Sequence, residues 1–450
     1  MSRQLKIFFS GIGGSGVSAI AGFMAEKGHF IVGSDRLFDL SIDHPVRKRL
    51  EENGVIIFPQ NGQGLDASFD FAVFSTSVEK NNPDFKKAEM LGIPLKTRPE
   101  YLSQIVSQYR TIAVAGTSGK STTSGLLAFL MQRLGMSPNF IGGGRVKQFR
   151  TLRNSGNYFT GSSDILIIEA CESDGTIVNY KPFYSIILNL DLDHHSIDQT
   201  AGMFEKLSDN TSGFVLVCAD DKNLASCNIR NARFFSILLN SEYQARDIAY
   251  RPLSTVFKVN GQEFELSLPG EYNLYNAVAC ISLLSELGIS LQAIAAVLPE
   301  FNGIERRFDI HRNDGRYLVI DDYAHNPHKI QSLIGAVKKI SDKVCYIFQP
   351  HGYGPTRLMK EGYIEIFAKG LRSSDHLVLL PIYYAGGTAA RDISSKDLAG
   401  GVAASGRSVE VIAHRSEVLN KAGLWDTYVV LGARDDTLSE LAEQIARDLG

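Results

Sequence analysis

The sequence predicts an α/β protein of three domains: a Rossmann-like N-terminal domain, a central α/β domain of the P-loop type with a small β-hairpin region, and a C-terminal Rossmann-like α/β domain. Three stretches open with a short apolar strand, a glycine-containing loop and an amphipathic helix, which is typical of parallel-sheet units. The chain has 450 residues, and domains of roughly 150 residues make three the expected number. We expect the domains to span residues 1–107, 108–307 and 308–450.

The predicted elements follow the apolar runs of the chain. In the first domain we expect strands at 6–10, 30–34 and 71–75 and a helix near 14–27. In the second we expect strands at 110–115, 165–169 and 185–190, a helix at 120–135, and a hairpin at 255–266 that turns at Asn260-Gly261. In the third we expect helices between strands at 317–321, 343–348, 376–380, 408–412 and 428–431.

The net charge, the cysteine spacing and the length of the apolar runs limit which kinds of partner and compartment we expect. Forty-six Lys and Arg against 49 Asp and Glu give a net charge of −3, so no overall basic field favours a nucleic acid or an anionic membrane. The five cysteines follow neither a disulfide nor a metal-binding spacing, and no run is long enough to cross a bilayer. We expect a cytoplasmic protein with no nucleic-acid partner and no membrane insertion, a monomer or weak homodimer.

The first glycine cluster lies between a predicted strand and a predicted helix. Gly11, Gly13 and Gly16 have the G-x-G-x-x-G spacing, which lets backbone N–H groups approach a pyrophosphate at the helix N-terminus. Asp35 follows the second strand, where an acid that binds ribose would stand. The cluster by itself favours NAD or FAD; the alternatives are another diphosphate, such as a nucleotide-sugar, and a tight turn with no ligand.

The second glycine cluster predicts an ATP-binding phosphate loop. Residues 111–123 read TIAVAGTSGKSTT, an apolar strand followed by a loop and a helix. Val114 stands where the longer form of the motif has glycine, so the match is to a shortened form. We expect the loop to cradle phosphates, with the Lys120 charge on them and the Ser121 hydroxyl on magnesium. The predicted contacts are Gly116, Thr117, Ser118, Gly119, Lys120, Ser121 and Thr122. A solvated lysine at a helix start would explain neither glycine.

Acidic and imidazole side chains follow two predicted strands of the same domain. One group is Glu169, Cys171, Glu172, Ser173 and Asp174, and the other is Asp191, Asp193, His194 and His195. Since the carboxyl ends of parallel strands meet at one edge, both groups would lie beside the phosphate loop and could hold Mg²⁺. Solvated acidic loops are the alternative.

Three further groups carry possible chemistry. Asn273 and Asn276 share a helix face and could read the edge of adenine, although Asn273 could equally cap the helix. Arg306 and Arg307 form an arginine pair, and such pairs most often lie on the solvated surface. The strand-end residues Asp321, Asp322, Tyr323 and His325 could supply acid–base chemistry.

The order and spacing of these motifs resemble the Mur ligases of bacterial cell-wall synthesis, and within them the branch that joins L-alanine. The resemblance spans nearly the whole chain. The matching stretches are GIGGSGVSAIAGFMAEKGHFIVGSD (11–35), AVAGTSGKSTT (113–123), EACESDG (169–175), NLDLDHH (189–195), the pair Asn273 and Asn276, ERRFD (305–309), DDYAHNP (321–327) and FQPH (348–351). An oxidoreductase would leave the phosphate loop unexplained.

The resemblance implies a ligase reaction and a set of site residues. ATP would phosphorylate the lactyl carboxylate of UDP-N-acetylmuramate, and the amine of an amino acid, L-alanine first, would then attack the acyl phosphate to form an amide. The first glycine cluster is thereby reassigned to the UDP-sugar, with Gly11, Gly13, Gly14, Gly16, Asp35 and Ser75 as its contacts.

The resemblance also implies a role for each residue of the ATP and amino-acid sites. Lys120 would stabilise the transferred charge, and Ser121, Glu169 and His194 would hold Mg²⁺ or Mn²⁺. Adenine would lie against Asn273 and Asn276. Arg307 and Asp322 would contact ATP. The incoming amino acid would face His325, His351, Tyr353 and Arg357. Of these residues, we expect Lys120, Glu169, His194, Arg307 and His325 to be catalytic.

The sequence departs from the family pattern near the expected amino-acid site. The L-alanine branch carries FQPHRYSRTR, whereas this chain has Gly352, Gly354 and Pro355 there and retains only Tyr353 and Arg357. Cys171 replaces a usual aspartate, and GARDD at 432–436 replaces a glycine-rich loop. A relative that joins another amino acid or a peptide, as in murein recycling, and a non-catalytic nucleotide-binding homologue are therefore the alternatives.

Overall fold

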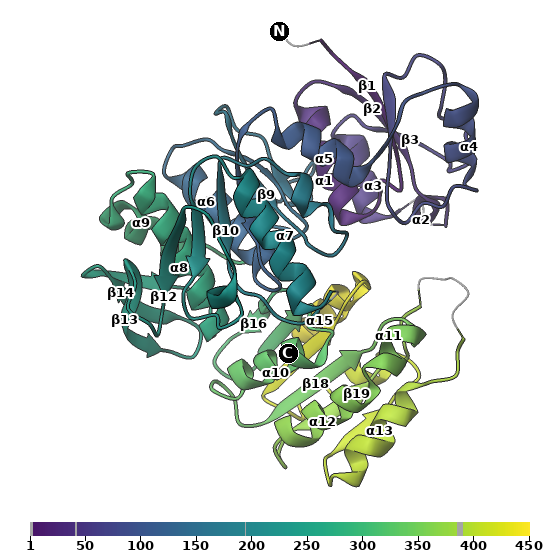
Figure 1. The fold of residues 1–450 in the computed structure, drawn as a ribbon. Helices are drawn as coiled ribbons and strands as arrows, with labels where there is room; N and C mark the ends of the chain where they lie inside the picture. Colours follow the sequence, from purple (N-terminus) through teal and green to yellow (C-terminus); the bar gives the residue numbers. More distant parts are fainter. Residues whose placement is uncertain (1–2, 41–42, 194, 385–389) are drawn as a thin grey trace. The chain divides into compact units, whose positions relative to one another are not determined.

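The computed structural model describes residues 3–40, 43–193, 195–384 and 390–450 (Figure 1). The chain forms two compact units, Met1–Ile304 and Glu305–Gly450. The first unit holds two β-sheets and the second unit holds one. Within the described ranges, none of the helices is both long and apolar enough to cross a membrane.

The first sheet has five parallel strands in the order β3-β2-β1-β4-β5. Its strands are β1 (Lys6–Ser10), β2 (Phe30–Ser34), β3 (Ile56–Phe58), β4 (Phe71–Phe74) and β5 (Leu95–Thr97), and its helices are α1 (Ser15–Glu26), α2 (Arg36–Leu40), α3 (Pro45–Glu52), α4 (Pro83–Met90) and α5 (Arg98–Val106). The strand order reverses between β1 and β4. The carboxyl ends of these two strands therefore form the switch point at which open α/β sheets bind ligands.

The second sheet has ten strands in the order β15-β14-β13-β12-β11-β10-β6-β9-β7-β8. Its strands are β6 (Arg110–Ala115), β7 (Asn139–Ile141), β8 (Tyr158–Phe159), β9 (Ile165–Glu169), β10 (Tyr184–Ile187), β11 (Val215–Cys218), β12 (Ala232–Ser236), β13 (Tyr243–Tyr250), β14 (Thr255–Val259) and β15 (Gln262–Leu266). Strand β6 pairs in parallel with β9 on one side and β10 on the other. The loops that follow these three strands therefore share one edge.

Four α-helices and four 3-10 helices accompany the second sheet. The α-helices are α6 (Lys120–Arg133), α7 (Ile197–Asn210), α8 (Glu271–Glu286) and α9 (Leu291–Val297), and the 3-10 helices are η1 (Lys147–Phe149), η2 (Thr176–Asn179), η3 (Leu224–Ser226) and η4 (Leu298–Glu300). Helix α6 begins directly after the glycine loop that follows β6, so its N-terminus points its free N–H groups at that loop.

The third sheet, in the second unit, has the order β16-β17-β21-β18-β19-β20, with only the edge strand β16 antiparallel. Its strands are β16 (Asp309–Asn313), β17 (Leu318–Asp322), β18 (Val344–Gln349), β19 (His376–Leu379), β20 (Val409–Val411) and β21 (Thr427–Gly432). Its helices are α10 (Pro327–Val337), α11 (Tyr353–Leu358), α12 (Lys360–Gly370), α13 (Ser395–Ala404), α14 (Ser416–Leu419) and α15 (Thr437–Asp448).

The central strands form because their apolar residues are covered on both faces. Every residue of β18 and β21 is buried, as expected for parallel strands between two helix layers. Strand β14 instead alternates buried and half-buried residues, and it turns into β15 at Asn260 and Gly261, which both have positive φ. The predicted hairpin is confirmed, since this turn needs residues that tolerate such φ angles.

Most expected elements lie within two residues of where the sequence places them, and one strand ends three residues early. The strand expected at 185–190 is β10, which ends at Ile187. Its continuation leaves the sheet because Asn189 and Asp191 bond to the glycine loop instead. The apolar patterns did not identify β3, β5, β7, β8, β11, β12, β13 or β16. The boundary expected at 107/108 lies inside the first unit, between α5 and β6, and stays a prediction.

Candidate functional site

The loop between β6 and α6 has the conformation of a phosphate cradle. Gly116 and Gly119 have φ angles of +135° and +87°. A Cβ on Gly116 would lie 3.0 Å from the Leu188 Cβ, and one on Gly119 would lie 2.5 Å from the Asn276 Oδ1. Both positions therefore require glycine. The Ser118 N–H donates to the Asn189 Oδ1 at 2.8 Å, so the end of β10 braces the loop.

Lys120 is buried at the start of α6 and is fully engaged. Its Nζ donates to the Gly116 carbonyl at 2.6 Å, the Thr117 carbonyl at 3.3 Å and the Glu172 Oε2 at 2.8 Å. Burial alone would lower the pKa of Lys120, but the neighbouring Cys171 and Glu172 side chains reverse this effect and raise it. The lysine is therefore a fixed positive charge that points at the loop. Sequence reasoning placed Glu172 nearby but did not identify it as the partner of Lys120.

Ser121 and Glu169 meet, as the parallel-strand argument predicts. The Ser121 Oγ donates to the Glu169 Oε1 at 2.8 Å, and the Gly143 N–H donates to the Glu169 Oε2 at 2.8 Å. A hydroxyl and a carboxylate so close together suit a hard cation such as Mg²⁺. The third expected ligand, His194, lies outside the described residues. Among the residues that are described, no group of three His, Cys, Asp or Glu side chains could hold a metal ion.

The two asparagines of α8 are buried but make different contacts. The Asn273 Nδ2 donates to the Pro269 carbonyl at 2.7 Å, which is a bond that fixes the start of the helix. The Asn276 Oδ1 lies against Gly119 of the phosphate loop. The structure thus places Asn276 beside the loop, and the pairing of both asparagines with adenine stays a prediction.

The first glycine turn lies at the switch point between β1 and β4. Gly11 has a φ of +77°, and a Cβ there would lie 2.7 Å from the Ser75 Cβ, so the turn and the end of β4 are in close contact. The Gly13 N–H donates to the Asp35 Oδ2 at 2.8 Å, and the Leu37 N–H donates to the Asp35 Oδ1 at 2.9 Å. The buried Asp35 therefore holds the turn in place. The sequence predicted that this residue binds ribose and did not predict its bonds to the turn.

Helix α1 follows the turn, with Gly14 as its N-cap and Gly16 in its first turn. Arg98 lies beside Gly16, where an added Cβ would lie 3.3 Å from the Arg98 Cδ. The Arg98 Nη2 also bonds to the Asp174 Oδ2 at 2.6 Å. The end of β9 and the segment after it thus contact the second glycine cluster through Glu169 and Glu172, while Asp174 bonds to Arg98, which lies beside the first cluster.

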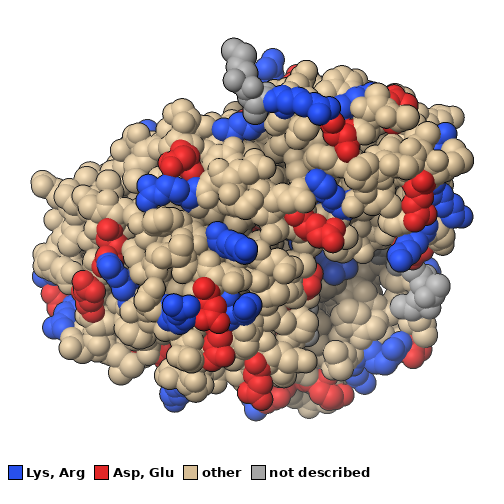
Figure 2. Space-filling view, turned by 45° about the horizontal axis from the view of Figure 1, so that its top comes forward, with Lys and Arg blue, Asp and Glu red and all other residues tan. Residues whose placement is uncertain are grey.

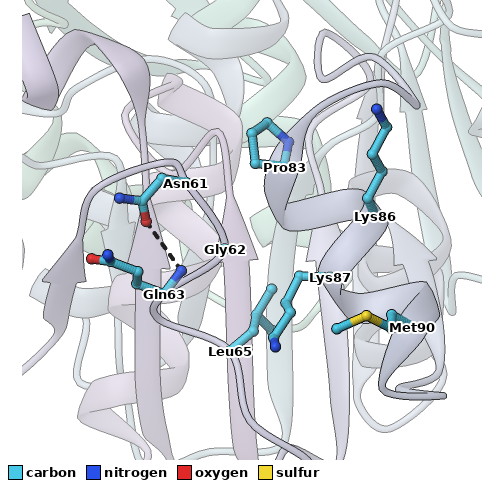
Figure 3. A pocket seen from close by; sticks show the side chains of 8 residues that line it. All are labelled: Asn61, Gly62, Gln63, Leu65, Pro83, Lys86, Lys87 and Met90. Atoms are coloured by element: carbon cyan, nitrogen blue, oxygen red, sulfur yellow. Dashed lines mark hydrogen bonds between the residues drawn. The ribbon is translucent and has the colours of Figure 1, made fainter.

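A separate shallow pocket of about 460 Å³ lies beside α4 (Figure 3). It is lined by Asn61, Gly62, Gln63, Leu65, Pro83, Lys86, Lys87 and Met90. The Gln63 N–H donates to the Asn61 Oδ1 across its rim at 3.1 Å. None of the predicted site residues lines this pocket.

In the second unit, Arg306 rather than Arg307 is the buried arginine. Its Nε bonds to Asp321 at 3.2 Å, and its Nη2 and Nη1 donate to the Gly432 and Asp435 carbonyls. Arg307 lies over the Tyr323 ring at 4.9 Å. Asp322 accepts from the Phe308 and Ala324 N–H groups, both at 2.7 Å. Asp322 therefore holds the backbone just before β16 and just after β17, and its expected ATP contact stays a prediction.

Two histidines meet at the carboxyl ends of β17 and β18. The rings of His325 and His351 lie edge to face with their centroids 5.1 Å apart. Burial lowers the pKa of His325 to about 3 and that of His351 to about 4. Both imidazoles are therefore neutral at pH 7 and can accept a hydrogen bond. Tyr353 begins α11 next to this pair, while Arg357 at the other end of α11 is engaged by Asp392 and by the Ala390 carbonyl.

The surface carries charges of both signs. On the face drawn in Figure 2, Lys and Arg side chains alternate with Asp and Glu. This mixture is what the near-balanced composition leads one to expect.

Comparison with known proteins extends these observations over the whole chain. Residues 6–110 match the model described as Mur ligase family, catalytic domain; residues 114–284 match the Mur ligase middle domain; and residues 306–434 match the Mur ligase, glutamate ligase domain. The UDP-N-acetylmuramate–L-alanine ligase of Caldicellulosiruptor saccharolyticus is 31% identical over 96% of this chain and 96% of its own. The ligase of the same name from Alkaliphilus metalliredigens is 34% identical over 85% of this chain and 84% of its own.

Solved structures agree with the fold. The UDP-N-acetylmuramate-alanine ligase of Thermotoga maritima has a TM-score of 0.82 at 26% identity and covers 99% of both chains. A murein peptide ligase of Psychrobacter arcticus has a TM-score of 0.72 at 22% identity, again over 99% of both chains, and shows similarity of fold alone. The predicted three-domain α/β fold is confirmed.

Proposed function

The chain belongs to the Mur ligase family, and from this premise we propose that it joins the lactyl carboxylate of UDP-N-acetylmuramate to the amine of an amino acid, L-alanine first, with ATP as the energy source. The enzyme is an ATP-dependent amide ligase of peptidoglycan synthesis. We place the reaction in the cytoplasm, with the protein acting as a monomer or weak homodimer.

The observation that carries the proposal is the arrangement around the phosphate loop. Lys120 and Ser121 begin α6, and Glu169, which ends β9 and lies 48 positions after Ser121 in sequence, meets them there. The lysine charge and the helix N-terminus favour bound phosphates, and the hydroxyl and carboxylate provide hard oxygen ligands. If Lys120, Ser121 and Glu169 served only to stabilise the fold, the loop before them would not need glycine at both position 116 and position 119.

The reaction divides into two steps. A carboxylate oxygen of the sugar attacks the γ-phosphorus of ATP. The bond between the γ-phosphorus and the oxygen that bridges it to the β-phosphate breaks. The products are ADP and an acyl phosphate. Lys120 stabilises the charge that moves onto the departing oxygen. Ser121 and Glu169 would hold a magnesium ion, which would supply further positive charge against the ATP phosphates.

The second step forms the amide. The amine attacks the acyl carbon, a C–N bond forms, and the C–O bond to phosphate breaks. The amine must lose a proton as the amide forms, and the neutral imidazoles of His325 and His351 can orient the amine by accepting a hydrogen bond from it. We assign the first glycine turn to the UDP diphosphate, since it lies at the switch point of a separate sheet.

A product assay tests the proposal. The purified chain is incubated with ATP, Mg²⁺ and UDP-N-acetylmuramate, and with a panel of single amino acids and short peptides. We expect ADP release that requires both the sugar and one amino acid, and a product mass equal to their sum less one water. Product from a peptide alone would favour the recycling type of ligase, and no release with any acceptor would favour a non-catalytic homologue.

A further inference from the structure

The carboxyl ends of β18 and β19 are tied together by backbone hydrogen bonds. The Gly352 N–H donates to the Tyr383 carbonyl, and the Tyr383 N–H donates to the Pro350 carbonyl, both at 2.8 Å. His351 and Tyr383 are paired as an isolated parallel bridge. These bonds fix the position of His351 and Tyr353 relative to Tyr384, so the side chains form one rigid group beside His325.

Three buried polar atoms in this group have no hydrogen-bond partner among the residues that the structure describes. They are the His351 Nδ1, the Thr356 Oγ1 and the Tyr384 hydroxyl. His351 is 9% exposed and Thr356 is fully buried. Leaving buried donors and acceptors unpaired costs free energy, and a ligand at this group would supply partners to the His351 imidazole and the Tyr384 hydroxyl.

A guanidinium group lies over the ring of one of these residues, Tyr384. The Arg391 Cζ is 4.8 Å from the Tyr384 ring centroid and 5.9 Å from that of Tyr353, and the two rings are 5.2 Å apart. Stacking on aromatic rings holds a guanidinium in one plane and leaves its N–H edge free to bind a planar anion. Asp392, the nearest acid in sequence, bonds to Arg357 instead.

We propose that Arg391 and the Tyr384 hydroxyl bind the carboxylate of the amino acid that supplies the amine. A guanidinium binds a carboxylate through parallel N–H bonds, and a phenol can add one more. Across the group, His351 and His325 can accept from the amine. The arrangement thus has donors for one end of an amino acid and acceptors for the other.

This inference rests on the proposed ligase function and moves the carboxylate contact away from Arg357. Arg357 was expected to face the amino acid, but it bonds to Asp392 and Ala390. Gly352 and Pro355, which stand where the L-alanine branch has arginines, supply no cation. Arg391 also lies in this cluster. In the part of the chain that the structure describes, no acidic side chain pairs with it.

The test compares an amino acid with its own amide. Steady-state KM and kcat are measured for the best acceptor from the panel and for the same compound with a carboxamide, in the wild type and in Arg391→Gln, Arg391→Lys and Tyr384→Phe. We expect Arg391→Gln to raise the KM for the acid about ten- to hundredfold, the range of a lost charge-assisted bond, with kcat nearly unchanged. The KM for the amide should not rise, and Arg391→Lys should restore part of the affinity for the acid.

A matched control is Arg447→Gln, which removes an exposed arginine from the distant end of α15. It should change neither KM. If Arg391→Gln raises the KM for acid and amide equally, or leaves both unchanged while ligation continues, the assignment of Arg391 is wrong and the ligase proposal stands. Wild-type ligation of peptides alone would overturn the inference and the amino-acid acceptor of the proposed function, whereas the ligase activity itself would stand. Absence of ADP release with every acceptor would overturn the proposed function, and the inference with it.

Discussion

The Lys120 ammonium and the Glu172 carboxylate form a buried ion pair, with Nζ and Oε2 2.8 Å apart, and the ammonium also donates to two carbonyls of the phosphate loop. The lysine that would serve the ATP phosphates is thus held in place before any nucleotide binds. Glu172 follows β9, whose last residue is Glu169, and both contact the second glycine cluster, while Asp174 in the same segment bonds to Arg98 beside the first cluster.

Replacing Lys120 by Ala should abolish ligation and leave UDP-sugar binding nearly intact. Loss of a charge that stabilises the transferred phosphoryl group should lower kcat by about a hundredfold or more, whereas the UDP-sugar turn lies on another sheet. Turnover by ADP release and affinity by calorimetry measure the two effects. Because the change leaves Glu172 buried without its partner, Lys120→Ala combined with Glu172→Gln serves as the control for folding. A folded double variant that loses both functions would refute the separation of the two sites.

Glu169→Gln should raise the magnesium concentration needed for half-maximal activity by about tenfold. The amide keeps the size of the side chain but removes the anionic oxygen that meets Ser121. His194→Ala should act in the same direction, and manganese should support both variants at least as well as magnesium. The measurement is a titration of each metal against activity, together with a thermal melt. A lowered melting temperature with an unchanged metal midpoint would assign the residue a structural role only.

Gly13→Val should weaken UDP-sugar binding at least tenfold and spare ATP binding. An added Cβ would lie 2.9 Å from the Asp35 Oδ2 and 3.2 Å from the Phe38 ring, so the side chain must displace the carboxylate that braces the turn. Calorimetry with each nucleotide checks this. Gly202→Ala is the control, because a Cβ there meets nothing within 4 Å. Equal binding of the UDP-sugar by the Gly13→Val variant would remove the first glycine turn from the site.

The histidine pair should make the second unit less stable in acid. An unfolded histidine titrates at about 6.5, whereas burial lowers the pKa of His325 to about 3 and that of His351 to about 4. Between these values the unfolded chain binds more protons, so native stability is complete above pH 6.5 and falls as the pH drops toward 4. For His325 the loss between pH 7 and 5.5 should be about 1 kcal/mol.

Urea midpoints at pH 7, 6 and 5.5 measure this dependence. His325→Asn should flatten it relative to the wild type, while His414→Asn, on an exposed loop, should not. A variant at position 325 that loses stability with falling pH as steeply as the wild type would show that the imidazole is not the titrating group.

Several features could be predicted from the sequence because they depend on local patterns. The bounds of β1, β2, β6 and β9 coincide with the apolar runs, since a strand covered on both faces needs consecutive apolar residues. The two glycine turns and the Asn260-Gly261 hairpin could be located because each requires φ angles that few residues adopt. The meeting of Ser121 with Glu169 followed from the rule that parallel strands end at a common edge.

Other features depended on which segments lie side by side. The bonds of Glu172 to Lys120, of Asp35 to the Gly13 amide and of Arg98 to Asp174 join residues 22 to 76 positions apart. The short strands β3, β7 and β8 carry too few residues for a periodicity to be read. Arg391 gave no signal in the sequence, because only the pairing of the β18 and β19 ends brings Tyr353 and Tyr384 together beneath it. Local spacing determines turns and strands because it acts through backbone conformation. The partner of a charged side chain depends instead on strand order. Strand order follows from the burial of apolar surface over the whole sheet.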